Sequence, residues 1–588
     1  MSLIEDYLNY DKKYSEKYGD RTVVLMQVGS FYEIYGINPD NHEDNKRDKI
    51  YIIADITNLN IAKRSDRNSP ISIKNPVMCG FPCPSLSKWK DILINHGYTI
   101  VVIDQELIPG FKEPQRKINE IISPSLNMDT TNYTNHFVSI YLENIKDHKT
   151  GKELMFVGLS TVDVTTSESF VYETHSTADD TNLGLDEVFR FIHMFSPIEI
   201  LIHTENINNI SNEELISYLE IKNEIIHFNN YSNETKYKTP KFHNEILKKV
   251  FPNTKMLQPV EYIDMERMHF AIQSYIYLIQ FCYEHNETII EKWIKPKIWE
   301  PIQYLILSYD AIDQLNIMPN KYNKNTYNKS GIQSLWDVLD NTMTPMGRRL
   351  LRMNISHPII NKTELQNRYN TVELLINNNI FNNILKNLST ISDIDKLHRR
   401  IQISMLHPYQ LIQLELSHST SLKMVEYINS IEYLNNIHLD NKTIEIFKKS
   451  IEDYRSIFDF NKLIGIQNNQ ISFNIFKEGI YKDIDDVQNK INYCVGFMKA
   501  FADKLSSIIN GASIDIKNNE RDGHYLTISN SKASLLKEEL KKYITIPVEV
   551  NGLSHDINVK DIEFKSNLSI TKISIDLISR LSNEKIAY

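Results

Sequence analysis

The sequence predicts an α+β protein of several domains, and three observations support this fold class. The chain has 588 residues, more than one hydrophobic core organises, so several domains are expected. Strand-like and helix-like runs alternate up to about residue 255, and apolar residues recur at helical spacing over most of the chain beyond it. A hydrophobic fraction of 41% and a charged fraction of 24% are those of globular domains.

Residues 1–130 are predicted to form a small mixed α/β domain. Short β-rich runs alternate here with helical stretches such as residues 84–97, PSLSKWKDILINHG. Such alternation is typical of a sheet covered by helices. The runs expected to be strands are RTVVLMQV (21–28), KIYIIADIT (49–57) and YTIVVID (98–104).

A second α/β domain is predicted over residues 131–255. Three strand patterns are followed by an amphipathic helix pattern, LDEVFRFIHMF, and by a further apolar strand pattern, IEILIH. Strands followed by a helix and another strand favour an α/β sheet. The three strand patterns are HFVSIYLEN, LMFVGLSTVDVTT and ESFVYE.

The region 256–480 is predicted to be helical throughout. Its most apolar long segment, MHFAIQSYIYLIQFCYEH (268–285), carries Gln, Ser and His and is short for a bilayer span, so a buried helix is expected. Residues 318–331, MPNKYNKNTYNKSG, interrupt the helical pattern with polar residues, Pro and Gly, which indicates a loop.

Residues 481–565 are predicted to form an αβ module that begins with a long helix over about 480–510. Residues 566–588 are expected to be helical again, and their pattern has no Gly or Pro stop, which predicts a helix that continues past residue 588. The expected strands of the module are HYLTISN, YITIPVEV and DINVKDIEF, with the helix SKASLLKEELKKY among them.

Charge and cysteine content restrict the classes of function. A formal charge of −10 argues against a generally basic nucleic-acid binder and confines any DNA contact to a local patch. Of the four cysteines, the pair in CGFPC has a spacing that suits neither zinc ligation nor a redox dithiol, so reduced intracellular thiols are expected. The stretch MSLIEDYLNYDKK lacks the pattern of a targeting sequence.

The stretch LMQVGSFYEIYG (25–36) carries the principal candidate site. In a strand, Phe31 and Glu33 project from one face while Tyr32 projects from the other. An aromatic ring can enter a weakened base step, and a neighbouring carboxylate can accept a hydrogen bond from an exposed base edge. The alternative interpretation is that Phe31 belongs to the core and that Glu33 is a solvated strand end.

This stretch resembles the MutS family of DNA mismatch-repair proteins, whose N-terminal domain carries a Gly-x-Phe-x-Glu pattern matched here by Gly29, Phe31 and Glu33. The resemblance continues in colinear order over nearly the whole chain. Its further segments are NPVMCGFP, VVIDQE, RKINEIISPS, MFVGLSTVDVTTSESFVYE, the core-like SLWDVLDNTMTPMGRRLLRMNISHPIINKTELQNRYNTVELL, SDIDKLHRRI and the clamp-like RDGHYLTISNSK.

The resemblance implies a domain order and a function. It implies a mismatch-recognition domain (1–130), an RNase H-like connector (131–255), a helical core and lever (256–480), a clamp (481–565) and the start of a returning lever helix (566–588). The implied partner is double-stranded DNA with mismatches or small loops, which Phe31 would enter as a wedge while Glu33 accepts a bond from a base edge. DNA-backbone contacts are expected from Lys63, Arg64, Arg67, Lys532 and Lys537.

The resemblance also implies an ATPase domain that this sequence does not show. A Gly-x-x-x-x-Gly-Lys-Ser/Thr phosphate loop is absent from these residues, so we assign no catalytic residue and no cofactor to the chain. ATP, Mg²⁺ and homodimer formation are expected of a C-terminal domain outside it, and a fragment, a split gene and an engineered truncation all stay open. Some relatives in giant viruses and octocoral mitochondria add a nuclease. An intracellular protein without membrane contact is expected, of viral, mitochondrial or nuclear location.

Other candidate sites have plainer interpretations. The pattern of a glycine followed by two arginines, Gly347, Arg348 and Arg349, indicates a role in packing and salt bridges rather than in phosphate binding. Near the clamp-like strands, Glu538 and Glu539 reduce the positive charge of the lysine-rich segment 532–542. Its lysines are therefore interpreted either as phosphate contacts or as part of a solvated helix face. His357 and His524 lack partners at ligand spacing and are not expected to bind a metal. Two alternative functions stay open. The first is an ATPase enzyme, and the second is a scaffold, or a protein that binds DNA junctions or partner proteins, without mismatch recognition.

Overall fold

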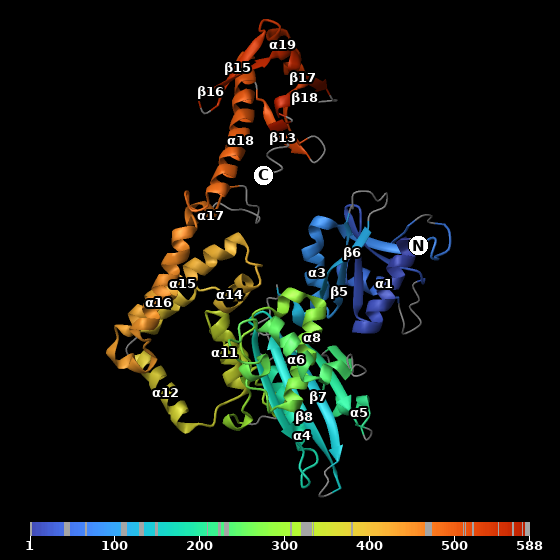
Figure 1. Ribbon diagram of the computed structural model, residues 1–588, viewed down its shortest axis with the longest axis vertical. Helices are drawn as coiled ribbons and strands as arrows, with labels where there is room; N and C mark the ends of the chain where they lie inside the picture. The colour runs from blue at the N-terminus through green and yellow to red at the C-terminus, as the bar shows by residue number, and fades with distance from the viewer. Residues whose placement is uncertain are drawn as a thin grey trace. The chain divides into compact units, whose positions relative to one another are not determined.

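The protein is described by a computed structural model that divides into two compact units. The first unit comprises Met1–Leu406 with Leu416–His438, and the second comprises His407–Glu415 with Leu439–Tyr588 (Figure 1). The finer five-part division expected from the sequence stays a prediction. The residues described are 3–39, 48–64, 68–106, 115–128, 135–146, 151–207, 210–221, 225–228, 235–305, 309–318, 332, 334–377, 380–464, 473–509, 511, 513–519, 523–550, 552–566, 570–578, 580 and 581.

The N-terminal part of the first unit is a mixed sheet with three helices. Its strand order is β3-β4-β2-β1-β5-β6, in which β1 and β5 are parallel and the other neighbours are antiparallel. The mixed α/β arrangement predicted here is therefore present, whereas its bounds as a domain stay a prediction. The elements are α1 (Leu3–Tyr18), β1 (Thr22–Val28), β2 (Phe31–Gly36), α2 (Lys49–Thr57), β3 (Ala62–Lys63), β4 (Val77–Pro82), α3 (Leu86–Asn95), β5 (Thr99–Glu106) and β6 (Gln115–Ile122).

The run at 49–57 is the helix α2, so the strand predicted there is wrong. Its β-branched composition favours a strand, but Ile50, Ile53, Ala54 and Thr57 are buried, together with the adjacent Tyr51. The first four recur at i, i+3, i+4 and i+7, which is the spacing of one helix face. Burial of that face against the sheet outweighs the local strand preference.

The second part of the first unit is a sheet in the order β11-β10-β7-β8-β9-β12. The strands and the amphipathic helix predicted between 131 and 255 are present, whereas the RNase H-like description stays a prediction. The strand β12 comes from beyond residue 255 and pairs in parallel with β9. The elements are β7 (His136–Lys146), β8 (Glu153–Asp163), β9 (Glu168–His175), α4 (Leu183–Phe195), β10 (Glu199–Glu205), α5 (Asn212–Tyr218), β11 (Ile225–Phe228), α6 (Pro240–Val250), α7 (Pro259–Tyr262) and β12 (Lys297–Ile298).

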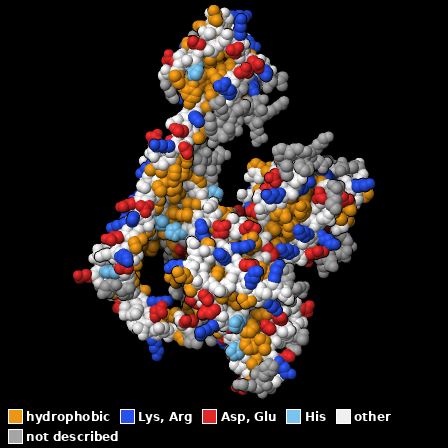
Figure 2. All heavy atoms as spheres, viewed as in Figure 1, with side chains coloured by type: hydrophobic (Ala, Val, Ile, Leu, Met, Phe, Trp, Pro, Cys, Tyr) orange, Lys and Arg blue, Asp and Glu red, His pale blue; other side chains and the backbone are white. Residues whose placement is uncertain are grey.

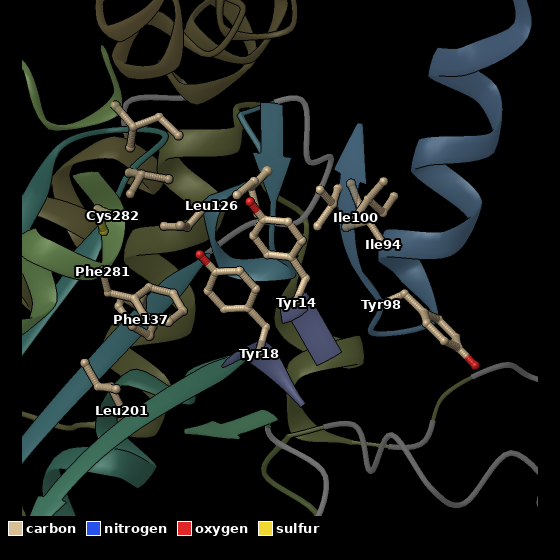
Figure 3. Packing of buried hydrophobic residues seen from close by; sticks show 14 of the residues in the cluster. Tyr14, Tyr18, Ile94, Tyr98, Ile100, Leu126, Phe137, Leu201, Phe281 and Cys282 are labelled. Atoms are coloured by element: carbon tan, nitrogen blue, oxygen red, sulfur yellow. The ribbon is translucent and has the colours of Figure 1, made fainter. Parts of the chain in front are cut away.

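The helix α8 (His269–His285) packs on this second sheet and is buried along most of its length, as predicted. Gly158 on β8 permits the contact, because a Cβ atom there would lie 1.9 Å from the carbonyl oxygen of Phe270. Phe281 of α8 also meets Tyr18 of α1, with ring centroids 6.1 Å apart. Apolar residues of α1, both sheets and α8 thus form one continuous core (Figure 3).

The remainder of the first unit is mainly helical where it is described, as the sequence predicts. The region 256–480 is not helical throughout, however, because it contributes the strand β12 to the second sheet. Most of the loop predicted at 318–331 lies outside the described residues. Across the described chain, we find no helix with the length and apolarity that a bilayer span requires. The helices are α9 (Tyr309–Gln314), α10 (Leu335–Leu339), α11 (Pro345–Ser356), α12 (Lys362–Asn377), α13 (Phe381–Leu388), α14 (Ile394–Gln402) and α15 (Pro408–Asn429), the last of which begins in the second unit.

The second unit places an αβ module after a long helix, as predicted. The single strand predicted for DINVKDIEF is wrong, because a 3-10 helix at Val559–Asp561 divides that run into two strands. Apolar residues of α18 and α19 form its core together with residues of the strands. The strands form a sheet, β13-β14-β18-β17, and a hairpin of β15 with β16. The elements are α16 (Asn441–Ile457), α17 (Phe460–Leu463), α18 (Lys482–Ile508), β13 (Asp515–Asn519), β14 (Gly523–Ser529), α19 (Asn530–Leu540), β15 (Thr545–Val550), β16 (Leu553–Asn558), β17 (Glu563–Ser566) and β18 (Ile570–Ser574).

The helix predicted from residue 566 onward is wrong over its first part. Residues 570–574 form β18, which pairs with β14 and β17. The buried residues here are Thr571, Ile573 and Ile575. Their spacing of two is the strand period, and the edge of β14 supplies the partner that makes a strand favourable.

Candidate nucleic-acid interface

A rigid hairpin carries the principal candidate residues. Strands β1 and β2 are joined through Gly29 and Ser30, and Gly29 has a φ of +61°, which glycine adopts without strain. The side-chain oxygen of Gln105 accepts a hydrogen bond from the Gly29 N–H at 2.8 Å, and the Gln105 N–H donates to the Gln27 side chain at 2.8 Å. Two glutamines from neighbouring strands therefore fix the turn. Gln27 was not identified from the sequence, although a polar residue within an apolar run is a signal.

Phe31 stands at the tip of this hairpin with 45% of its surface exposed. It pairs with Val28 on one side and with Pro82 of β4 on the other. Tyr32 has the opposite environment, since it is 5% exposed and its hydroxyl donates to Asp104 at 2.5 Å. The predicted alternation is present, and Phe31 is not a core residue.

Glu33 lies half-buried beside Phe31 and accepts a hydrogen bond from the Tyr35 hydroxyl. Burial and then this bond to Glu33 raise the pKa of Tyr35, so the phenol stays protonated and donates at neutral pH. Opposite Glu33 lies Gly80, where a Cβ atom would come within 3.3 Å of the Glu33 Cγ atom. The carboxylate is therefore held in place, and Tyr35 is a contributor that sequence reasoning missed.

The predicted basic positions near the hairpin differ in their surroundings. The Arg64 guanidinium is exposed and lies 5.6 Å from the centroid of the Tyr35 ring, so it belongs to the same site as Glu33. Lys63 is on β3, and its ammonium donates to the carbonyl oxygen of Ser69 at 2.8 Å. Arg67 lies outside the described residues.

The remaining predicted basic positions, Lys532 and Lys537, are on α19 in the second unit. Both are exposed, whereas Ala533 and Leu536 on the same helix are buried. The Lys537 ammonium lies 5.0 Å from the centroid of the Phe564 ring. Exposure agrees with either phosphate contact or a solvated helix face, so both interpretations remain.

The Gly-Arg-Arg stretch is structural, as predicted. The Arg349 guanidinium makes two bonds to the Asp393 carboxylate, at 2.6 and 2.9 Å, and a third to Asp395 at 2.8 Å. Arg348 pairs with Asp340 at 2.9 Å. These contacts attach the start of α11 to α10 and α14. The described chain shows no group of three or more His, Cys, Asp or Glu side chains arranged to hold a metal ion.

Charge is finely mixed over the visible surface. Lys and Arg side chains lie among Asp and Glu side chains on the face drawn in Figure 2, and no large area of a single sign is seen there among the described residues. Long-range attraction of DNA by one broad basic face is therefore not a feature of this view.

Comparison with known proteins identifies two matching family models. The model of MutS domain I matches residues 6–131, which include Phe31 and Glu33. The model of MutS domain III matches residues 310–546, which include α11 and α18.

Individual relatives match over almost the full chain. A DNA mismatch repair MutS homologue of Acanthamoeba polyphaga mimivirus is 31% identical, over 95% of this chain and 52% of its own length. The DNA mismatch repair protein MutS of Petrotoga mobilis is 25% identical, over 97% of this chain and 62% of its own length. That of Caldanaerobacter subterraneus is 27% identical, over 83% of this chain and 50% of its own length. The chain thus spans about half to three-fifths of the length of these relatives.

Proposed function

Because this chain belongs to the MutS family of DNA mismatch-repair proteins, we propose that it binds mismatched or unpaired bases in duplex DNA. The observation that carries the proposal is the exposed Phe31 ring at the tip of a fixed hairpin, next to the Glu33 carboxylate. In this proposal Phe31 enters the base stack as a wedge. Glu33 then accepts a hydrogen bond from the base edge that the wedge exposes.

Recognition of this kind depends on the deformability of the duplex. Mispaired and unpaired bases cost less free energy to unstack and kink than paired bases do. A protein that requires a kink therefore binds them preferentially, without reading a base sequence. Arg64, with Lys63 and Arg67 and with Lys532 and Lys537 of the second unit, would add contacts to phosphates, which contribute affinity but no sequence preference.

We expect Phe31→Ala to abolish most of the preference for mismatched over paired duplex while the fold is kept. Stacking of an aromatic ring on a base contributes ~1–3 kcal/mol, which corresponds to a loss of about 5-fold to 150-fold in the affinity ratio. Because the ring is already 45% exposed, its removal should change thermal stability little. Equilibrium binding to matched pairs of mismatched and paired duplexes measures the ratio.

The control for this experiment is Phe381→Ala, which removes a ring of similar exposure, 41%, at the start of α13. This variant should keep the affinity ratio of the parent. An unchanged ratio in the Phe31 variant would remove Phe31 from the site. A parent protein with equal affinity for both duplexes would instead point to the scaffold or junction-binding alternative.

Glu33 should contribute discrimination rather than affinity, because a carboxylate near phosphates is unfavourable unless a base donates to it. Glu33→Gln should bind paired duplex more tightly than the parent and show a smaller ratio of mismatched to paired affinity. Glu33→Ala should behave similarly, but with lower affinity for mismatched duplex than Glu33→Gln. Tyr35→Phe is the matched control, since it removes the donor to Glu33 but keeps the charge. It should bind paired duplex as the parent does, and no gain for paired duplex in either Glu33 variant would make Glu33 a solvated strand end.

ATP use and the pairing of two copies enter the proposal only for sequence outside this chain, since the chain spans about half to three-fifths of its relatives' length. We assign ATP and Mg²⁺ use, and the pairing of two copies, to sequence outside these 588 residues. The similarity to a mimivirus protein supports a viral origin and action inside a host cell.

A further inference from the structure

The first unit contains a cavity of about 680 Å³. Its lining residues lie between His136 and Gln402 in the sequence, so none of them belongs to the hairpin that carries Phe31. The starts of β7 and β9 and the end of α4 form one wall, and α11 and α14 form the other. Its apolar lining includes Phe170, Phe195, Leu350 and Met353. Cavities of 300–1,000 Å³ at the junction of two substructures are the usual size and place of small-molecule sites.

The acidic side chains of the cavity wall are all engaged. Asp163 accepts bonds from the backbone and hydroxyl of Thr165, at 2.9 and 2.6 Å, and from the Asn135 N–H at 3.2 Å. Glu168 pairs with Lys297 at 2.7 Å, and Asp395 pairs with Arg349 at 2.8 Å. Each of these three carboxylates therefore already has a hydrogen-bond donor or an ion-pair partner.

The basic side chains of the wall divide into two groups. Four of them have partners. Lys297 and Arg349 pair with the carboxylates named above, and Lys295 pairs with Asp264. Arg399 donates hydrogen bonds to backbone carbonyl groups. Arg352 on α11 differs, because its guanidinium has no hydrogen-bond acceptor and no ion-pair partner within the described part of the chain.

Burial changes the pKa values of the arginine and histidine side chains that line the cavity. Burial lowers the pKa of Arg352 from its ordinary value, and no carboxylate acts in the opposite direction. Burial also lowers the pKa of His357 to about 4 and lowers those of His136 and His398, so these rings are neutral at pH 7. A half-buried guanidinium that is partly shielded from water and has no counter-charge is unfavourable, which an anion in the cavity would correct.

We propose that this cavity binds a small organic anion with an aromatic or otherwise apolar body, whose anionic group contacts the Arg352 guanidinium. The planar guanidinium suits a carboxylate, sulfonate or phosphate group, which it can bind through two parallel hydrogen bonds. The rings of Phe170 and Phe195, with centroids 5.1 Å apart, and the side chains of Leu350 and Met353 would cover the apolar body. This site is independent of the proposed contact with DNA.

The test uses two fluorescent probes of the same shape, the anionic dye anilinonaphthalenesulfonate and its uncharged parent phenylnaphthylamine. The protein should bind the anionic dye at a saturable site, and Arg352→Gln should weaken that binding by about 10-fold to 100-fold. Affinity for the uncharged probe should stay within about twofold, because it has no group for Arg352 to contact. Arg352→Lys, which keeps the charge, should restore part of the loss.

Two further variants locate the site. Ser356→Phe adds a ring at the cavity wall, next to the carbonyl oxygen of Arg352 that Ser356 contacts at 2.9 Å, and should weaken both probes. Arg368→Gln on the exposed side of α12 is the matched control and should change neither. Melting curves by circular dichroism confirm that each variant is folded. The proposal is overturned if Arg352→Gln binds the anionic dye as the parent does, if Arg368→Gln weakens it equally, or if Ser356→Phe affects neither probe.

Discussion

Replacing Arg399 by methionine should lower the free energy of unfolding of the first unit by about 3–5 kcal/mol, since bonds from a charged donor contribute roughly 1.5–3 kcal/mol each. Arg399 is 1% exposed, and its guanidinium donates to the carbonyl oxygens of Ile289, Glu291 and Val164. Methionine keeps the apolar stem but removes every donor. The contact that joins α14 to the end of β8 and to the segment after α8 would then be lost.

Urea denaturation and amide hydrogen exchange of residues 287–291 measure this effect. Arg368→Met is the control, because Arg368 makes an exposed pair with Glu364 on its own helix, and such pairs contribute about 0.3–0.5 kcal/mol. Faster exchange should appear in the Arg399 variant alone. Equal midpoints for the two variants would show that Arg399 does not join these elements.

Glu199→Ala should have an effect of similar size, a loss of about 3–5 kcal/mol, because it removes one member of a buried polar cluster. The Glu199 carboxylate is fully buried on β10 and accepts bonds from the His227 ring at 2.6 Å and from the Ser125 hydroxyl at 2.5 Å. Burial by itself would raise the pKa of Glu199, but the bonds from His227 and Ser125 outweigh it and hold the pKa below its ordinary value. Removal of the carboxylate leaves two buried donors without an acceptor.

The sign of the pKa shift predicts how this contribution varies with pH. A carboxyl group whose pKa is lower in the folded state stabilises the fold above its unfolded pKa of about 4.3, and the contribution is lost as the pH falls further. Glu199→Ala should therefore be less stable than the parent at pH 7, and the difference should shrink under acid conditions. Glu168→Ala is the control, because Glu168 is half-exposed in its pair with Lys297 and should contribute about 0.2–1 kcal/mol. A difference that is constant from pH 7 to acid would contradict the buried charged cluster.

The exposure of the candidate residues could be predicted from the sequence because its determinants are local, whereas the hairpin itself was not predicted. Alternation around Phe31, Tyr32 and Glu33 gives opposite faces in any strand, and Gly29 permits the turn wherever the hairpin lies. The supporting contacts could not be predicted in the same way. Gln105 is 76 residues from Gly29 in the chain, and only the pairing of β1 with β5 brings its side chain to the turn.

The wrong predictions for α2 and β18 have a common cause. For α2 and β18, composition and the absence of stop residues indicated one state, whereas the buried positions followed the period of the other. The period becomes decisive only when a neighbouring sheet or strand buries one face. The long helix α18 and the buried helix α8 were predicted correctly because their helical patterns are long enough to be unambiguous.

By itself, the sequence determined the α+β class, the order of the strands and helices along most of the chain, the likeness to the MutS family and the candidate residues Phe31 and Glu33. These properties depend on spacing between residues that are close in the chain. Only the tertiary structure decided the buried cluster of Ser125, Glu199 and His227, the carbonyl contacts of Arg399 and the cavity beside Arg352. The physical reason is that burial and electrostatic compensation arise between segments far apart in the chain, so the environment of a charged side chain is set by the packed fold and not by its neighbours in sequence.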